Sequence, residues 1–126
     1  DISSYGVVSG AKQSERVYLL DKIVEKPALE DAPSDMGVTG RYIFTPQIFS
    51  HLARLKPGAG GEYQLTDAIQ TLLAEEQVLA YEYEGVRYDC GSKMGLLKAN
   101  IELGLEHGEI GEDLRHYLKN ELLGKL

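Results

Sequence analysis

The sequence predicts an α/β fold with a mixed sheet and flanking helices, with α+β as the alternative class. Two observations carry this prediction. Short apolar runs typical of strands alternate along the chain with segments of helical periodicity. Proline, glycine and hydroxyl residues stand between these segments, where turns and helix ends are expected. The length of 126 residues suits about one domain with one hydrophobic core.

Strands are predicted near the start of the chain. The first spans residues 5–8, and the second spans residues 17–24. Pro27 ends the second strand, because proline lacks the N–H group that a strand ladder needs. Residues 38–44 are predicted to form the third strand. Gly40 interrupts it and suggests a bulge or a ligand close to the backbone.

The middle of the chain alternates between helix and strand. Thr45 and Pro46 predict a helix start, as a hydroxyl N-cap followed by proline. Thr66 is predicted to cap the next helix. Residues 78–83 alternate in the manner of a half-buried strand, and a turn is predicted to lead into a further short strand at residues 86–88.

The end of the chain, residues 92–126, is predicted to be helical. A long helix follows Ser92, and a second amphipathic helix follows Gly111. The apolar residues that recur at helical spacing are Met94, Leu97, Ile101 and Leu105 in the first, and Leu114, Tyr117, Leu118 and Leu122 in the second.

Composition excludes several classes of protein. A net charge of −7 argues against non-specific nucleic-acid binding, although a phosphate ligand would need only a few local cations. No apolar run approaches the ~18 residues of a membrane span and no signal peptide is visible, so we expect a soluble protein. A single cysteine, Cys90, favours a cytoplasmic location. Because Asp1 replaces the usual methionine, we expect the sequence to begin inside a larger fold, with tag cleavage as the alternative.

The tripeptide Glu25-Lys26-Pro27 is a candidate binding site, because it stands where a strand leaves the sheet. The proline breaks the regular alternation of side chains and would let Glu25 and Lys26 reach one pocket. A carboxylate suits sugar hydroxyl groups, and an ammonium group suits a phosphate. The alternative is an exposed ion pair on an edge strand.

Asp89 is a candidate metal ligand. It lies between a β-segment and a helix, and Mg²⁺ prefers hard oxygen ligands and usually takes only one or two protein carboxylates. The alternative is an aspartate that caps the helix near Ser92, with Gly91 as a turn residue.

Other polar residues offer weaker sites. The glycine-rich stretch at residues 60–67 lacks the Walker pattern and is predicted to be a loop and helix cap rather than a phosphate site. Residues 58–61 are predicted to be a flexible, glycine-rich loop. Cys90 has no nearby histidine or second cysteine to activate it as a nucleophile. The three histidines, without metal-ligand spacing, are predicted to lie on the surface: His51, His107 and His116.

Several motifs in chain order resemble the C-terminal half of the bacterial UTP–glucose-1-phosphate uridylyltransferases (UDP-glucose pyrophosphorylases). The similarity covers nearly the whole chain and weakens after about Gly108. The related thymidylyl and adenylyl transferases share a Glu-Lys-Pro motif but usually not Asp-Cys-Gly-Ser-Lys. The matching stretches are Tyr5-Gly6-Val7-Val8, Ile23-Val24-Glu25-Lys26-Pro27, Ala32-Pro33-Ser34, Gly40-Arg41-Tyr42-Ile43-Phe44-Thr45-Pro46, residues 60–69 (Gly-Gly-Glu-Tyr-Gln-Leu-Thr-Asp-Ala-Ile) and Arg87-Tyr88-Asp89-Cys90-Gly91-Ser92-Lys93.

This resemblance implies a Rossmann-like nucleotidyltransferase fold and a set of substrate contacts. The Gly6 backbone and Glu25 would hold the glucose hydroxyls, Lys26 the sugar phosphate, and the Val38 backbone the far side of the sugar. Asp89 would be one of two aspartates that hold Mg²⁺. The second aspartate and the glycine-rich loop for UTP phosphates are absent from this chain.

The implied reaction transfers UMP from UTP to glucose 1-phosphate and releases pyrophosphate, with Lys26 and Asp89 as the catalytic residues. We expect this chain to be inactive alone, since part of the site is missing. Three alternatives stay open: a dTDP-sugar enzyme, an ADP-sugar enzyme, and a non-catalytic assembly module. The family is commonly oligomeric, and residues 92–126 would then carry subunit contacts.

Overall fold

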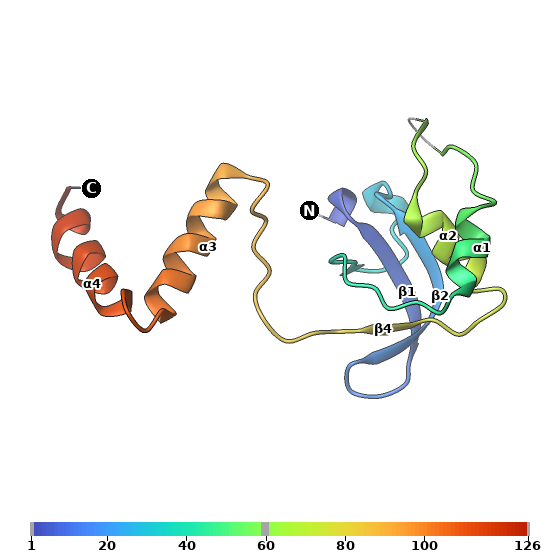
Figure 1. The fold of residues 1–126 in the computed structure, drawn as a ribbon, viewed down its shortest axis with the longest axis horizontal. Coiled ribbons are helices and arrows are strands. Elements are labelled where there is room, and N and C mark those ends of the chain that lie inside the picture. Colours follow the sequence, from blue (N-terminus) through green and yellow to red (C-terminus); the bar gives the residue numbers. More distant parts are fainter. Residues whose placement is uncertain (1, 59–60, 126) are drawn as a thin grey trace. The chain divides into compact units, whose positions relative to one another are not determined.

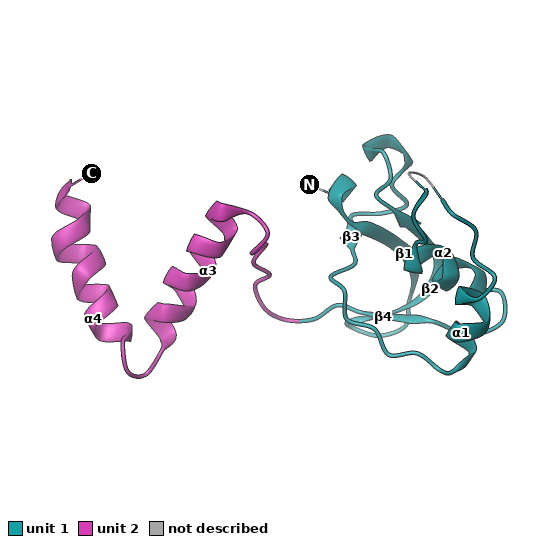
Figure 2. Cartoon of the chain, turned by 45° about the horizontal axis from the view of Figure 1, so that its top comes forward, with its two compact units in different colours: residues 1–83 teal, residues 84–126 magenta. Residues whose placement is uncertain are grey.

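The computed structural model describes residues 2–58 and 61–125. Residues 59 and 60, within the predicted glycine-rich loop, lie outside the described residues. The chain divides into two compact units, residues 1–83 and residues 84–126 (Figure 2). The first unit holds the strands and two helices, and the second is helical. The predicted α/β class is therefore confirmed.

Four strands form one sheet in the order β3-β1-β2-β4. They span Gly6–Lys12 (β1), Val17–Glu25 (β2), Met36–Gly37 (β3) and Leu79–Tyr81 (β4). All the pairings among the described residues are antiparallel, whereas we expected a mixed sheet. A tight hairpin explains the central pair, since parallel strands need a long crossover connection. The predicted ends of β2 and β4 agree with the structure to within a few residues.

The core of the first unit lies between the sheet and its two helices (Figure 1). Helix α1 spans Gln47–Leu52 and helix α2 spans Leu65–Leu72. Helix α2 packs on β2, and α1 packs on α2. Full burial of a large aliphatic side chain contributes about 1.5–3 kcal/mol, so this cluster supplies much of the stability. Its buried members are Val8, Ile23, Ile48, Ala68, Ile69 and Leu72.

Helix α2 also completes the hydrogen bonding of β2. The Gln70 side chain accepts a hydrogen bond from the Ile23 backbone N–H at 2.8 Å. Strand β4 pairs with β2 only at residues 17–19, so this N–H lies beyond the paired stretch. A buried N–H needs a partner, and Gln70 supplies one from the helix. This bond fixes α2 along β2.

Two predicted strands are absent from the structure. Residues 38–44 are irregular: the Val38 N–H still donates to the Gly6 carbonyl at 2.8 Å, but Gly40 then adopts a φ of 77°. A positive φ is not extended backbone, so the ladder cannot continue. Residues 86–88 form no strand either, and they follow Gly85 with a φ of 130°.

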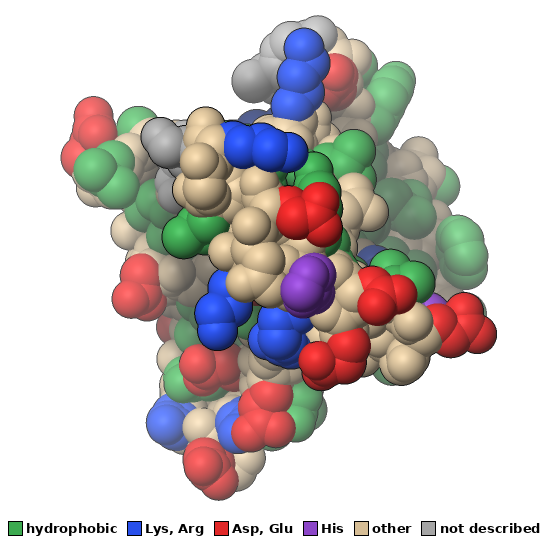
Figure 3. Space-filling model, turned by 90° about the vertical axis from the view of Figure 1, so that its left-hand side faces the viewer, with side chains coloured by type: hydrophobic (Ala, Val, Ile, Leu, Met, Phe, Trp, Pro, Cys, Tyr) green, Lys and Arg blue, Asp and Glu red, His purple; other side chains and the backbone are tan. Residues whose placement is uncertain are grey.

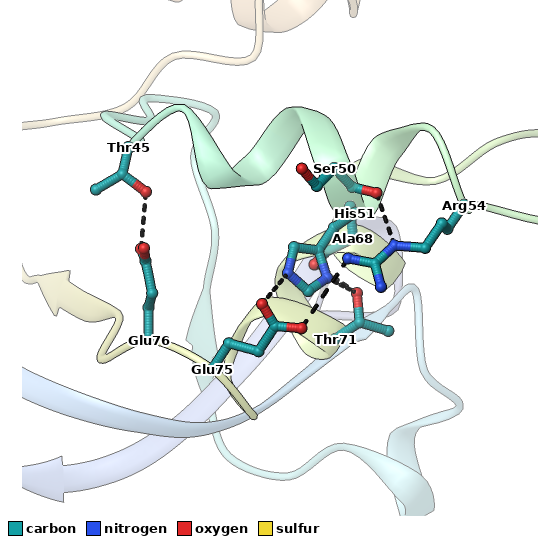
Figure 4. Close-up of polar contacts among 8 residues, drawn as sticks. All are labelled: Thr45, Ser50, His51, Arg54, Ala68, Thr71, Glu75 and Glu76. Carbon is teal, nitrogen blue, oxygen red and sulfur yellow. Dashed lines mark hydrogen bonds and ion pairs between the residues drawn. The ribbon is translucent and has the colours of Figure 1, made fainter.

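Two predicted helix caps are also wrong. The Thr45 hydroxyl donates to Glu76 Oε2 at 2.7 Å (Figure 4) and makes no cap bond, and Pro46 occupies the N-cap of α1. Gln64 is the N-cap of α2, and Thr66 stands one position inside its first turn. In both cases the hydroxyl residue next to a helix start does not serve as the cap.

The second unit contains the helices predicted after Ser92 and Gly111. Helix α3 spans Lys93–Glu106, and the Ser92 hydroxyl caps it by accepting a hydrogen bond from the Gly95 N–H at 3.0 Å. Helix α4 spans Gly111–His116 and continues as a π-helix at Tyr117–Leu122 (η4). Within the described residues, no helix is both long and apolar enough to cross a membrane.

Candidate functional site

The first candidate site lies where β1 begins and β2 ends. Gly6 and Glu25 face each other across the antiparallel ladder, and the Val38 N–H donates to the Gly6 carbonyl. The Lys26 N–H donates to the Tyr5 carbonyl at 3.0 Å. The first unit therefore brings together the four residues that the sequence suggested for binding, namely Gly6, Glu25, Lys26 and Val38.

Three side chains converge on Gly6. A Cβ atom at this position would lie 3.2 Å from Glu25 Oε2, 3.2 Å from Thr66 Cγ2 and 3.7 Å from Val38 Cγ2. Contacts at 3.2 Å are tighter than almost all real Cβ contacts, so the neighbours would have to move. Glycine is thus required here because Glu25 and Thr66 lie too close to the Gly6 backbone for a Cβ to fit without their moving.

Lys26 occupies an uncommon backbone conformation, with a φ of 43°. A left-handed backbone costs an L-residue about 1–2 kcal/mol, and such strain gathers at functional sites. In a regular strand, consecutive side chains point to opposite faces. Here Lys26 Nζ lies 4.0 Å from Glu25 Oε1, so the two charged groups lie near each other.

The Glu25–Lys26 ion pair is weak by itself. The Lys26 side chain is 60% exposed and that of Glu25 is 26% exposed, and solvent screens a pair of this kind. Strand β4 pairs with β2 only at residues 17–19, so among the described residues the Glu25 end of β2 pairs with β1 alone. An exposed ion pair at a strand edge, the alternative interpretation from the sequence, therefore fits this arrangement as well.

Tyr42 lies near enough to Glu25 for the carboxylate to affect its pKa, although sequence reasoning gave it no role. Burial raises the pKa of the Tyr42 hydroxyl, and the nearby Glu25 carboxylate raises it further. The Tyr42 ring stacks on Phe44 with ring centroids 5.5 Å apart. A neutral phenol beside Glu25 can donate a hydrogen bond. Its only sequence signal was its place within the matching stretch at residues 40–46.

Thr66 is the second residue that sequence reasoning missed. Its side chain is only 4% exposed and contacts the space over Gly6. Thr66 reaches this place because Gln70, one helical turn later on the same face of α2, is bonded to Ile23 of β2. The helix therefore runs along β2, with its first turn at the Gly6–Glu25 end.

Asp89 belongs to the second unit, whereas Glu25 and Lys26 belong to the first. Its carboxylate Oδ1 accepts a hydrogen bond from the Gly91 N–H at 3.2 Å, and its carbonyl accepts one from the Ser92 N–H at 3.2 Å. Ser92, rather than Asp89, caps α3. The Asp89 side chain shapes the turn before the helix and remains exposed.

A neighbouring tyrosine anchors this turn to α3. The Tyr88 hydroxyl donates to Glu102 Oε2 at 2.6 Å, and this hydrogen bond raises the pKa of Tyr88. This hydrogen bond holds Tyr88, the residue before Asp89, against α3. Within residues 2–58 and 61–125, no group of three or more His, Cys, Asp or Glu side chains could hold a metal ion. An Asp89-bound Mg²⁺ would thus need oxygen ligands from a substrate or another segment, as is usual for this ion.

The histidine prediction is wrong for His51, which is 5% exposed. Its Nδ1 lies 2.8 Å from the Thr71 hydroxyl, and that hydroxyl donates to the Ala68 carbonyl (Figure 4). Nε2 lies 3.4 Å from Glu75 Oε2. These bonds join α1 to α2, so His51 has a structural role; His107 and His116 are exposed as predicted.

Surface charge agrees with the composition. On the face drawn in Figure 3, Lys and Arg side chains are interspersed with Asp and Glu, and no extended basic patch is visible. A continuous basic surface is the usual feature of proteins that bind nucleic acids. This face offers none.

Comparison with known proteins identifies the family. The model of the family described as Nucleotidyl transferase matches residues 1–104. This chain belongs to the Nucleotidyl transferase family. The match includes every site residue predicted from the sequence, from Gly6 to Asp89.

This chain is similar to UTP–glucose-1-phosphate uridylyltransferases and UDP-glucose pyrophosphorylases. It is 50% identical over 119 residues to the UTP–glucose-1-phosphate uridylyltransferase of Streptococcus pyogenes, across 94% of this chain and 39% of the relative. A UDP-glucose pyrophosphorylase solved with UDP-glucose is 44% identical, with a TM-score of 0.79 over 84% of this chain and 40% of that one. A UTP-bound UGPase from Acinetobacter baumannii is 36% identical, with a TM-score of 0.81 over 95% of this chain and 41% of that one. The chain thus spans about two fifths of these relatives.

Proposed function

We propose that this chain is the sugar-phosphate-binding half of a UTP–glucose-1-phosphate uridylyltransferase. One observation carries the proposal: Gly6, Glu25, Lys26 and Val38 converge at the end of β2, in a chain that is 50% identical to an enzyme of that name. The complete enzyme would transfer UMP from UTP to glucose 1-phosphate, giving UDP-glucose and pyrophosphate.

Each residue has a role that follows from its chemistry. The Glu25 carboxylate accepts hydrogen bonds from glucose hydroxyls, and the Gly6 and Val38 backbones lie beside it. The Lys26 ammonium group, which is largely exposed beside Glu25, pairs with the phosphate of the sugar. A carboxylate next to an ammonium group suits a ligand that has hydroxyls at one end and a phosphate at the other.

The reaction requires no general base. A phosphate oxygen of glucose 1-phosphate is already anionic at neutral pH. It attacks the α-phosphorus of UTP, a new P–O bond forms, and the bond to pyrophosphate breaks. The protein contributes positioning and charge neutralisation, and Lys26 reduces the repulsion between the two phosphates.

Enzymes of this family generally use a divalent metal ion. We propose Mg²⁺, with Asp89 as one protein ligand, because its exposed carboxylate is a hard oxygen donor. When bound, the ion would supply positive charge to the phosphates. The second protein ligand of the ion would come from outside this chain.

We also propose a cytoplasmic location. The single cysteine, Cys90, is free and exposed, which is in keeping with a reducing compartment.

The binding role of Lys26 can be tested by titrating glucose 1-phosphate into the full-length enzyme that contains this chain. Lys26→Ala should raise the Kd about tenfold or more, since a charge-assisted contact is lost. Lys22→Ala is the matched control, because Lys22 is an exposed lysine of β2, the strand that ends just before Lys26. Equal affinities of the wild type and Lys26→Ala would refute the assignment.

The identity of the base is a separate question. Relatives named here act on uridine nucleotides by their names, which favours UTP over dTTP and ATP. Turnover of glucose 1-phosphate with each of the three nucleotides would decide it. A preference for dTTP or ATP would replace the uridylyl assignment and leave the sugar-phosphate site unaffected.

We also propose that the helical end carries subunit contacts in the full-length enzyme. Among the residues of α3, only Ala99 is buried, while Met94, Leu97 and Leu103 are each more than half exposed. Sedimentation of the wild type and of a Met94→Glu, Leu97→Glu variant tests this. Identical sedimentation of the two proteins would contradict it.

A further inference from the structure

The Thr66 hydroxyl has no role in holding the fold. Thr66 is 4% exposed, and its Oγ1 has no hydrogen-bond partner among the residues that the structure describes. Among the described residues, the other buried side-chain atom without a hydrogen-bond partner is His51 Nε2, and the Glu75 carboxylate lies 3.4 Å from it. A buried hydroxyl without a partner destabilises a protein, and valine would fill the same volume without that penalty. The hydroxyl therefore calls for an explanation beyond packing.

The position of Thr66 beside Gly6 and Glu25 offers an explanation for its buried hydroxyl. Thr66 Cγ2 and Glu25 Oε2 both lie 3.2 Å from the point where a Cβ of Gly6 would stand. The branched end of Thr66 thus contacts the same small space as the Glu25 carboxylate. Threonine in a helix populates two side-chain rotamers. One step between staggered rotamers would place the hydroxyl where the methyl group now lies, over Gly6.

We propose that Thr66 is a specificity-determining residue that donates a hydrogen bond to a hydroxyl group of the hexose phosphate held by Glu25. This inference rests on the proposed function and adds a residue to its site. A sugar hydroxyl that gives its proton to the Glu25 carboxylate still has lone pairs that can accept a hydrogen bond. Thr66 can donate to those lone pairs, whereas a carboxylate cannot. Together the two side chains recognise one hydroxyl as both donor and acceptor.

Thr66→Val tests the proposal in the full-length enzyme, because valine keeps the shape and removes the hydroxyl. Its thermal midpoint without ligand should equal or exceed that of the wild type, since a buried unpaired hydroxyl is lost. The Kd for glucose 1-phosphate should rise about three- to tenfold, as expected for one neutral hydrogen bond. Thr66→Ser should bind within about twofold of the wild type.

Thr71→Val is the matched control on the same helix. The Thr71 hydroxyl is bonded to His51 and to the Ala68 carbonyl, so its removal should lower the thermal midpoint and leave the Kd unchanged. Should Thr66→Val fail to fold, Thr66→Ala removes the same hydroxyl, and the same loss of affinity is expected.

Deoxy analogues of glucose 1-phosphate separate a direct contact from an indirect effect on Glu25. For the analogue that lacks the shared hydroxyl, the wild type and Thr66→Val should bind equally. If Thr66→Val bound every analogue more weakly than the wild type by the same factor, the direct contact would be overturned. An unchanged Kd of Thr66→Val for glucose 1-phosphate would overturn it as well. A wild-type enzyme that binds no glucose 1-phosphate would overturn the proposed function as well.

Discussion

Replacing Gly6 by alanine should damage the sugar site more than the fold. The new methyl group would stand 3.2 Å from both Glu25 Oε2 and Thr66 Cγ2. Thr66 is held in the first turn of a helix, so it can retreat little. Glu25 ends in a flexible and partly exposed carboxylate, which can swing away. The methyl group is therefore accommodated chiefly by displacing Glu25.

The size of each effect follows from this geometry. Overpacking a protein interior costs about 1–3 kcal/mol, and we expect about 1 kcal/mol here because Glu25 can move. That lowers the thermal midpoint by about 2–8 °C. Loss of one hydrogen bond from a charged carboxylate costs about 1.5–3 kcal/mol. The affinity for glucose 1-phosphate should accordingly fall about 10- to 150-fold.

The assay pairs thermal denaturation with titration of glucose 1-phosphate in the full-length enzyme. Gly37→Ala is the matched control on the neighbouring strand, since its Cβ would lie 3.7 Å from the Tyr5 side chain, an ordinary contact. It should resemble the wild type in both measurements. Gly10→Ala should instead unfold the protein, because its Cβ would lie 2.2 Å from the Leu19 carbonyl oxygen. Wild-type affinity in a folded Gly6→Ala enzyme would refute the convergence over Gly6.

Three further predictions concern the charged and phenolic groups. Lys26→Gly should be more stable than Lys26→Ala by up to about 1 kcal/mol in denaturant melts, because glycine relieves the left-handed backbone, while both lose affinity for glucose 1-phosphate; a less stable Lys26→Gly would argue against strain. Asp89→Asn should lower turnover far more than sugar-phosphate affinity, and near-wild-type turnover would exclude the metal role. The raised pKa of Tyr42 means that its contribution to stability is complete below about pH 10, the unfolded pKa, and is lost as the pH rises through the folded pKa. Tyr42→Phe should therefore flatten the alkaline fall in stability, and identical pH profiles would contradict this.

Local signals in the sequence predicted some elements well. Pro27 marks the end of β2, and Ser92 marks the start of α3 through a hydroxyl cap that the structure contains. Both signals act within a few residues of the chain. Such short-range chemistry can be recognised without knowledge of distant contacts.

Other local signals were overruled by distant partners. Thr45 resembles a cap, but its hydroxyl bonds to Glu76 on another part of the chain. His51 resembles a surface residue, yet the contacts between α1 and α2 bury it. Apolar residues at 38–44 resemble a strand, but Gly40 turns the backbone out of the sheet. In each case the outcome depends on packing that a local pattern does not record.

The sequence by itself determined the family, the α/β class and the order of the motifs, because these depend on residue identity and spacing along the chain. Only the tertiary structure decided that Thr66 stands with Gly6 and Glu25. These residues are distant in sequence and meet because the register of β1 on β2 and the Gln70–Ile23 bond bring them to one end of the sheet. Register and helix packing are set by the whole core, so no single segment could have predicted that Thr66 joins these residues.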